Sequence, residues 1–211
     1  MKRRALIVGG AEAAAPVAVA LASHARLALL VEDARAGRQI LRRVREVRGR
    51  ARVIAGPLDT SADLGARIIE AERALRRAPD LAVLCPLDEL RGPGDPLFSD
   101  ERWHRTVARG LRAPWLWLSA LLPMMATEGG AVLIMLPRTE LPESADVAAT
   151  SAGLRQIARV AARVFAPSGV RVNCLRPGRG TTAEDIAGAA LALLRPSPLN
   201  AQLVELDPQR W

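Results

Sequence analysis

The stretch Gly169-Val-Arg-Val-Asn-Cys-Leu-Arg-Pro-Gly178 decides the fold that we predict for this chain. Residues 170–174 form a short stretch rich in valine, which is typical of a strand, and Pro177-Gly178 closes the stretch with a turn. Short apolar runs occur along the whole chain, and segments with the apolar period of a helix separate them. We therefore expect strands and helices to alternate.

This alternation predicts an α/β fold in which helices cover both faces of one parallel sheet. Residues 1–211 are then expected to form a single Rossmann-like, doubly wound domain, long enough to bury a sizeable core. The expected strands cover residues 5–8, 27–31, 52–55, 81–84, 131–135, 170–174 and 203–206. The expected helices lie near residues 12–23, 35–47, 61–77, 100–110, 114–126, 146–164 and 183–194.

The composition excludes several kinds of chemistry. The chain has 211 residues and no tyrosine, and Lys2 is its only lysine, so that the other 29 of its 30 basic residues are arginine. A reaction that needs a tyrosine acid or an interior lysine is therefore excluded. The spacing of the two histidines and of Cys85 and Cys174 does not suit a Cys/His zinc cluster, and we expect no metal site.

The net charge of +8 raises the question of an acidic partner. The arginines are spread along the chain and no zinc-finger, RNP or KH motif accompanies them, so that the sequence does not favour nucleic-acid binding. The longest apolar run, residues 113–126, is too short to span a bilayer, and we expect no membrane segment. Two cysteines within apolar runs suit a reducing compartment, which favours the cytoplasm.

Four stretches resemble the short-chain dehydrogenase/reductase family, a Rossmann-type family, and they occur in the family's order. The stretch 169–178 is similar to the family's strand and turn "G-[IV]-R-V-N-x-[IL]-x-P-G". Residues 109–114, 183–187 and 200–207 resemble its central helix, a later helix start and its last strand. The resemblance implies this fold from the first strand to the last. None of the four stretches carries a catalytic residue.

The same resemblance implies a glycine-rich turn that holds a dinucleotide after the first strand, where the family has T-G-x-x-x-G-[IL]-G. Here Gly9 and Gly10 are a vestige of it, because Ala13 and Ala15 stand where the later glycines are needed and Glu12 adds a negative charge. We therefore expect no cofactor in this chain, although a partner could bind NAD(P).

Other positions that would contact the nucleotide are also changed. Pro57 and Leu58 follow the third expected strand, and Leu84-Cys85-Pro86-Leu87 replaces the family's N-N-A-G, so that we expect an apolar pocket. Glu32 or Asp33, after the second strand, could still meet a ribose hydroxyl.

The catalytic set is the decisive comparison. In active members of the family a tyrosine, a lysine, a serine and an asparagine act together, and the matching positions here are Val147, Ser151, Pro137 and Gly110. No shift of the alignment recovers the pair, because the chain lacks tyrosine and has lysine only at position 2. We expect the nearby hydroxyls of Thr139, Thr150 and Ser151 to be structural. The lid segment that follows Gly178 in active members is also expected to be absent.

Family members assemble through the central helix and the helix after it, here about residues 100–126 and 146–164. The candidate interface residues are Trp103, Trp115, Trp117, Ala152, Arg155, Arg159, Arg163 and, near the last strand, Trp211.

Three hypotheses follow. The first is a non-catalytic subunit that assembles with an active paralogue, for example in a hydroxyacyl-CoA or acyl-carrier-type dehydrogenase complex. The second is a binding or regulatory protein that docks an acidic partner, such as acyl carrier protein or nucleic acid, on the arginine cluster at residues 35–52. The third is an atypical NAD(P)-dependent oxidoreductase.

Overall fold

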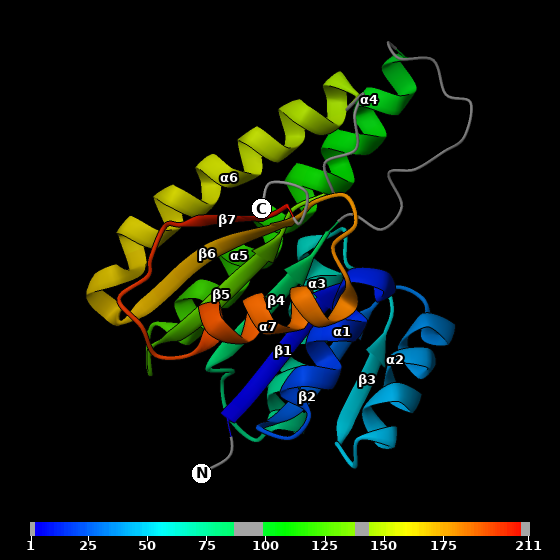
Figure 1. The fold of residues 1–211 in the computed structure, drawn as a ribbon, viewed down its shortest axis with the longest axis vertical. Coiled ribbons are helices and arrows are strands. Elements are labelled where there is room, and N and C mark those ends of the chain that lie inside the picture. Colours follow the sequence, from blue (N-terminus) through cyan, green and yellow to red (C-terminus); the bar gives the residue numbers. More distant parts are fainter. Residues whose placement is uncertain (1–2, 87–98, 138–143, 208–211) are drawn as a thin grey trace.

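The fold is a parallel sheet with helices on both faces, which confirms the predicted fold class (Figure 1). The computed structural model describes residues 3–86, 99–137 and 144–207. The sheet has the order β3-β2-β1-β4-β5-β6-β7, and every neighbouring pair of strands is parallel. The strands are β1 (Arg3–Gly9), β2 (Ala25–Val31), β3 (Ala51–Ala55), β4 (Leu81–Cys85), β5 (Gly130–Met135), β6 (Val170–Pro177) and β7 (Leu203–Leu206).

The helices divide between the two faces of the sheet. Side chains along a strand point alternately to opposite faces, so that Leu6 and Val8 pack on one core while Ala5 and Ile7 pack on the other. The first core contains α3 (Ser61–Leu75), α5 (Ala113–Met125) and α6 (Ala145–Phe165). The second contains α1 (Ala11–Leu21), α2 (Ala34–Glu46) and α7 (Ala183–Leu194). Burial on both faces explains why the central strands are continuous apolar runs.

The central helix differs from the expectation in one respect. We predicted two helices near residues 100–110 and 114–126, but α4 (Asp100–Val107) continues through the π-helical turn η1 (Ala108–Arg112) into α5. In η1 the N–H of Ala113 donates to the carbonyl of Ala108, five residues earlier. Pro114, which has no N–H, is therefore accommodated just after the widened turn. Gly110 is buried inside η1.

The stretch that predicts the fold ties β6 to the segment that leads into β7. The guanidinium of Arg171 donates to the carbonyls of Arg195 (2.7 Å) and Leu199 (2.9 Å) beyond the end of α7. Both polar ends of the Asn173 side chain are also engaged, since Nδ2 donates to the Leu199 carbonyl (3.0 Å) and Oδ1 accepts from the backbone N–H of Gln202 (3.0 Å). These motif residues therefore stabilise the fold.

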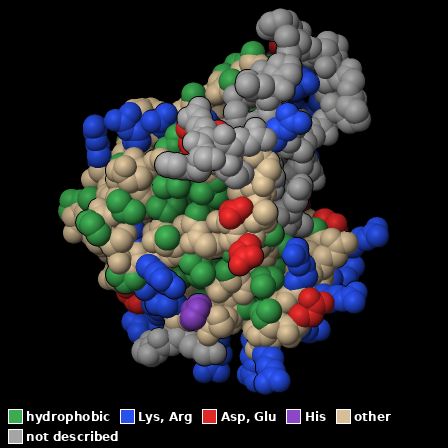
Figure 2. Space-filling model, viewed as in Figure 1, with side chains coloured by type: hydrophobic (Ala, Val, Ile, Leu, Met, Phe, Trp, Pro, Cys, Tyr) green, Lys and Arg blue, Asp and Glu red, His purple; other side chains and the backbone are tan. Residues whose placement is uncertain are grey.

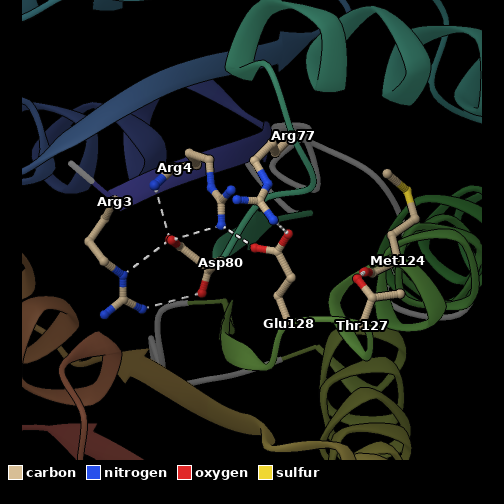
Figure 3. Close-up of polar contacts among 7 residues, drawn as sticks. All are labelled: Arg3, Arg4, Arg77, Asp80, Met124, Thr127 and Glu128. Atoms are coloured by element: carbon tan, nitrogen blue, oxygen red, sulfur yellow. Dashed lines mark hydrogen bonds and ion pairs between the residues drawn. The ribbon is translucent and has the colours of Figure 1, made fainter. Parts of the chain in front are cut away.

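Basic side chains occur in several separate groups on the face shown in Figure 2, and some of the positive charge of the chain is paired at the amino ends of the strands (Figure 3). Asp80 contacts Arg3 (Nε–Oδ1, 3.1 Å) and Arg4 (Nη2–Oδ2, 3.4 Å). Glu128 contacts Arg4 (Nη2–Oε2, 2.6 Å) and Arg77 (Nη2–Oε1, 2.6 Å), and its hydrogen bond from Arg4 is the main cause of its lowered pKa. The network joins β1 to the segments before β4 and β5.

Gly9 lies where β1 comes closest to β4. Its φ is +106°, and a Cβ built on it would lie 2.1 Å from the carbonyl oxygen of Cys85. The next residue uses the same oxygen, because the N–H of Gly10 donates to it at 2.9 Å. Only glycine fits at position 9 without moving β1 away from β4.

We expect Gly9→Ala to lower the free energy of unfolding by at least about 2 kcal/mol, because it combines an unfavourable φ with a clash against backbone. The matched control is Gly65→Ala in α3, where an added Cβ meets nothing within 4 Å. That control should raise stability by about 0.5–1 kcal/mol, since alanine is the better helix former. Urea unfolding of both variants measures the difference, and equal stabilities would contradict the prediction.

Candidate functional site

A cavity of about 510 Å³ opens at the carboxyl ends of β1, β2 and β4. It lies where the strand order reverses on either side of β1, which is the place where open α/β sheets bind ligands. Gly9 and Gly10 line it together with residues 31–33 at the end of β2, residues 58–59 after β3, and Cys85 and Pro86. One side of α4, η1 and α5 closes it.

The central helix adds positive charge to this cavity. Arg105, Arg109 and Arg112 line it together, because their spacing places them on one side of the helix. Arg112 also donates from Nη1 to the carbonyl of Asp59 (3.0 Å). The expectation of an apolar pocket is therefore only half right, since Leu58 lies in the lining but arginines form one wall. Their spacing indicates that they share one side of the helix, but only the structure shows that this side faces the cavity.

The acidic side of the cavity is partly engaged in capping. The Asp33 carboxylate accepts from the backbone N–H groups of Arg35 (2.8 Å) and Ala36 (3.2 Å), and these bonds hold its pKa below the usual value. Asp33 is thus the N-cap of α2. Glu32 is exposed beside it and also lines the cavity.

The two glycines of the first turn serve the junction of β1 and β4. The N–H of Gly10 donates to Cys85, and α1 begins at Ala11 directly after it. Ala14 and Ala15 are buried and belong to the core between the sheet and its helices. The contact with β4 is therefore sufficient reason for both glycines, and no ligand is needed to account for them. Ala15 stands where the family motif has a later glycine, and its methyl group is part of the core.

The four positions that match the catalytic set lie in α6, in η1 and directly after β5. Val147 and Ser151 lie in the first turns of α6, and Gly110 lies in η1. These helices are in close contact, because a Cβ on Gly153 would lie 3.1 Å from the side chain of Leu111. Pro137 follows β5, which pairs with β6.

A guanidinium group lies against the position of the family's lysine. Ser151 is buried, and its Oγ accepts a hydrogen bond from Nη2 of Arg176 (2.9 Å), at the end of β6. Nη1 of Arg176 pairs with Glu205 of β7 (2.8 Å). Sequence reasoning missed Arg176, although the alternation along β6 places it on the same side as Cys174, which packs toward α6.

The other nucleophiles near this position are occupied or protonated. Burial raises the pKa of Cys174 to about 12, although the charges of Arg155 and Arg176 act in the opposite direction, and the thiol is therefore protonated at neutral pH. The Thr150 hydroxyl donates to the carbonyl of Asp146 (2.7 Å). Thr139 lies outside the described residues.

Asp146 joins α6 to the central helix. It is buried, and its Oδ2 accepts from Arg102 Nε (2.9 Å) and from the Thr106 hydroxyl (2.7 Å). Burial by itself would raise the pKa of Asp146, but hydrogen bonds with Ser144, Thr106 and Arg102 and the charge of Arg102 lower it to about 2. This carboxylate directly precedes the tyrosine position and holds the two helices together.

The predicted interface residues differ in their exposure. Trp103 and Trp115 are 45% and 52% exposed. Trp117 is only 4% exposed, and its Nε1 donates to the carbonyl of Leu58 (2.9 Å), so that its prediction as an interface anchor was wrong: it belongs to the chain's own core. Trp211 lies outside the described residues. Ala152, Arg155, Arg159 and Arg163 are all exposed on α6.

Within residues 3–86, 99–137 and 144–207, no group of three or more His, Cys, Asp or Glu side chains could hold a metal ion. In the same ranges, each helix is too short or too polar to cross a membrane.

Comparison with known proteins found a family model that matches part of the chain and solved structures that share its fold. The model of the family described as enoyl-(acyl carrier protein) reductase matches residues 92–192, slightly less than half of the chain. A search of curated proteins found no match.

Among solved structures, levodione reductase superposes with a TM-score of 0.88 at 19% identity and covers 100% of this chain and 98% of its own. A short-chain type dehydrogenase/reductase from Mycobacterium marinum has a TM-score of 0.86 at 18% identity, with 98% and 94% covered. NAD+-bound xylitol dehydrogenase has a TM-score of 0.83 at 16% identity, with 97% and 98% covered. At these identities the likeness shows a common fold.

We expect Asp146 to make stability depend on acid pH. Because its pKa falls from 3.8 to about 2 on folding, its contribution is complete above about pH 4 and is lost as the pH falls through 2. The contribution amounts to about 2 kcal/mol. Urea unfolding between pH 7 and pH 2 should show this loss in the wild type and not in Asp146→Asn. The exposed Glu101→Gln in α4 is the control, and an Asp146→Asn profile equal to that of the wild type would contradict the assignment.

Proposed function

We propose that this chain is a non-catalytic, dehydrogenase-like subunit that assembles with an active short-chain dehydrogenase/reductase paralogue and stabilises or modulates it. One observation carries the proposal: Val147 and Ser151 stand at the tyrosine and lysine positions, and the chain has no tyrosine and only Lys2 to replace them. A positioned general acid contributes about 10²–10⁴-fold to a rate, so that its loss alone removes most of the catalysis.

The contacts around Ser151 support this view. The guanidinium of Arg176 supplies a cation near the lysine position, but its Nη2 and Nη1 are engaged with Ser151 and Glu205. An arginine stays protonated at any physiological pH, and therefore it cannot exchange a proton with a substrate. We infer that it preserves local packing and charge and takes no part in a reaction.

The partner is proposed from the resemblance. Active enzymes of this family include hydroxyacyl-CoA and acyl-carrier-type dehydrogenases, and the matching family description names an acyl-carrier-protein-linked reductase. The partner would bind NAD(P) and perform the chemistry, and the complex would act in the cytoplasm.

A nucleotide titration tests the loss of cofactor binding. We expect no change in nicotinamide or tryptophan fluorescence when NADH or NADPH is titrated to millimolar concentration, because the turn after β1 has lost the later glycines of the family motif. Binding in the micromolar range would contradict the proposal. It would favour the alternative of an atypical NAD(P)-dependent oxidoreductase, whose supporting observation is the 510 Å³ cavity beside Glu32.

Co-purification tests the assembly. The paralogue with intact tyrosine and lysine positions is co-expressed with the tagged chain, and Trp115→Ala should reduce its recovery at least about tenfold, as for loss of an aromatic anchor. Ile69→Ala is a matched control, because Ile69 in α3 and Trp115 are both 52% exposed. Equal recovery with both variants, or a tagged chain that sediments as a monomer beside the paralogue, would count against the subunit role.

A standalone regulatory protein is the other alternative. The observation that favours it is the row of exposed arginines in and after α2, namely Arg35, Arg38, Arg42, Arg43, Arg45, Arg48, Arg50 and Arg52. Charge reversal in this cluster separates the two ideas, since Arg43→Glu/Arg45→Glu/Arg50→Glu removes a contact made by the cluster and leaves one anchored by Trp115 intact.

A further inference from the structure

The outward face of α6 carries positive charge without a counter-ion. Arg155, Arg159 and Arg163 recur every four residues and are exposed. None of them makes an ion pair or a side-chain hydrogen bond with any residue that the structure describes, in contrast to the paired arginines in Figure 3. Basic side chains accordingly gather over the region of α6 in Figure 2. We call these three residues the α6 arginine stripe.

A hollow of about 440 Å³ lies beside this stripe. Arg155, Arg159 and Arg176 surround it, and the small side chains of Ala148 and Ala152 leave the space between them. Three guanidinium groups around a floor of methyl groups make a receptor for a carboxylate, because an arginine fork matches two carboxylate oxygens.

The guanidinium groups around the hollow have few hydrogen-bond acceptors among the described residues. The Nε atom of Arg176 is buried and has no hydrogen-bond partner, although the other two nitrogens of this guanidinium contact Ser151 and Glu205. This Nε atom is itself covered, so that a carboxylate in the hollow would gain from the charge of the Arg176 guanidinium as a whole. Glu205 is the only carboxylate that pairs with these arginines among the described residues.

A second copy of the chain fits this face poorly. The one acidic residue of α6 is Asp146, which is buried and paired with Arg102. A two-fold axis through the middle of α6 would therefore bring Arg155 against Arg155 of the other copy, with no carboxylate on either helix between them. Like charges in contact disfavour a complex and select against the wrong partner.

We propose that the α6 arginine stripe and its hollow receive the acidic helix of a different subunit, one that carries Asp or Glu where this chain carries Arg155, Arg159 and Arg163. This inference rests on the proposed function, because it assigns the chemistry of the partner's surface. The partner's carboxylates neutralise the stripe, and one of them enters the hollow above Ala148 and Ala152. The same charges keep this chain from pairing with itself.

A charge-reversed copy serves as a partner of known sequence. The variant Arg155→Glu/Arg159→Glu/Arg163→Glu should fold, because all three side chains are exposed and unpaired within the described structure. Sedimentation velocity is measured for the wild type, for the variant and for their mixture at about 0.05 M and about 0.5 M salt. We expect each chain alone to be a monomer, the mixture to form a species of two chains at low salt, and this species to decrease at high salt.

Two controls make the result specific to α6. Arg43→Glu/Arg45→Glu/Arg50→Glu reverses the same amount of charge in and after α2, and its mixture with the wild type should remain monomeric. Ala152→Leu in the wild-type chain fills the hollow without changing the charge, and it should weaken the mixed dimer about tenfold, as expected for an overpacked contact.

Three outcomes would overturn the inference: a wild-type chain that dimerises alone and loses the dimer on reversal of the stripe, a mixture that stays monomeric, or an α2 control that associates equally well. These outcomes are distinct from failure of the proposed function. If the chain binds NADH and also forms the mixed dimer, the non-catalytic role is contradicted and the acidic partner is supported. If the paralogue co-purifies through Trp115 but no mixed dimer forms, the non-catalytic role is supported and the acidic partner on α6 is contradicted.

Discussion

The contact between the ends of β1 and β4 is the constraint on which the rest of the structure depends. The carbonyl of Cys85 receives the N–H of Gly10 and leaves no room for a side chain on Gly9. This contact holds the two strands together where the strand order reverses, at the edge of the cavity at their carboxyl ends. A cavity of this kind is a consequence of the topology, and it persists whether or not its lining still suits a nucleotide.

The residues that match the family and those that depart from it perform different tasks. Arg171 and Asn173 hold β6, the end of α7 and the approach to β7 together. The departures, Val147 and Ser151, lie in the first turns of α6, where catalysis would need them. Changes at such positions leave the fold intact, because stability depends on buried hydrogen bonds and packing, whereas a proton transfer depends on a few side chains.

The distribution of charge separates structural arginines from those available to a partner. Arg4 is nearly buried and pairs with Asp80 and Glu128, so that its charge stabilises the amino end of the sheet. Arg159 and Arg163 are exposed and unpaired among the described residues, on a helix whose single carboxylate faces inward. Arginine therefore stabilises the fold at one end of the sheet, whereas on α6 the positive charge of the arginines is not neutralised by any described residue.

The sequence by itself determined the order of strands and helices, the doubly wound sheet and the lack of a tyrosine–lysine pair, because apolar periodicity and composition are local properties of the chain. Only the tertiary structure decided that Trp117 is core while Trp115 is exposed, that Arg105, Arg109 and Arg112 line the cavity, and that Arg176 contacts Ser151. These contacts join residues far apart in the chain or depend on which side of a helix meets the sheet. No local pattern encodes that choice, because the packing of the whole molecule makes it.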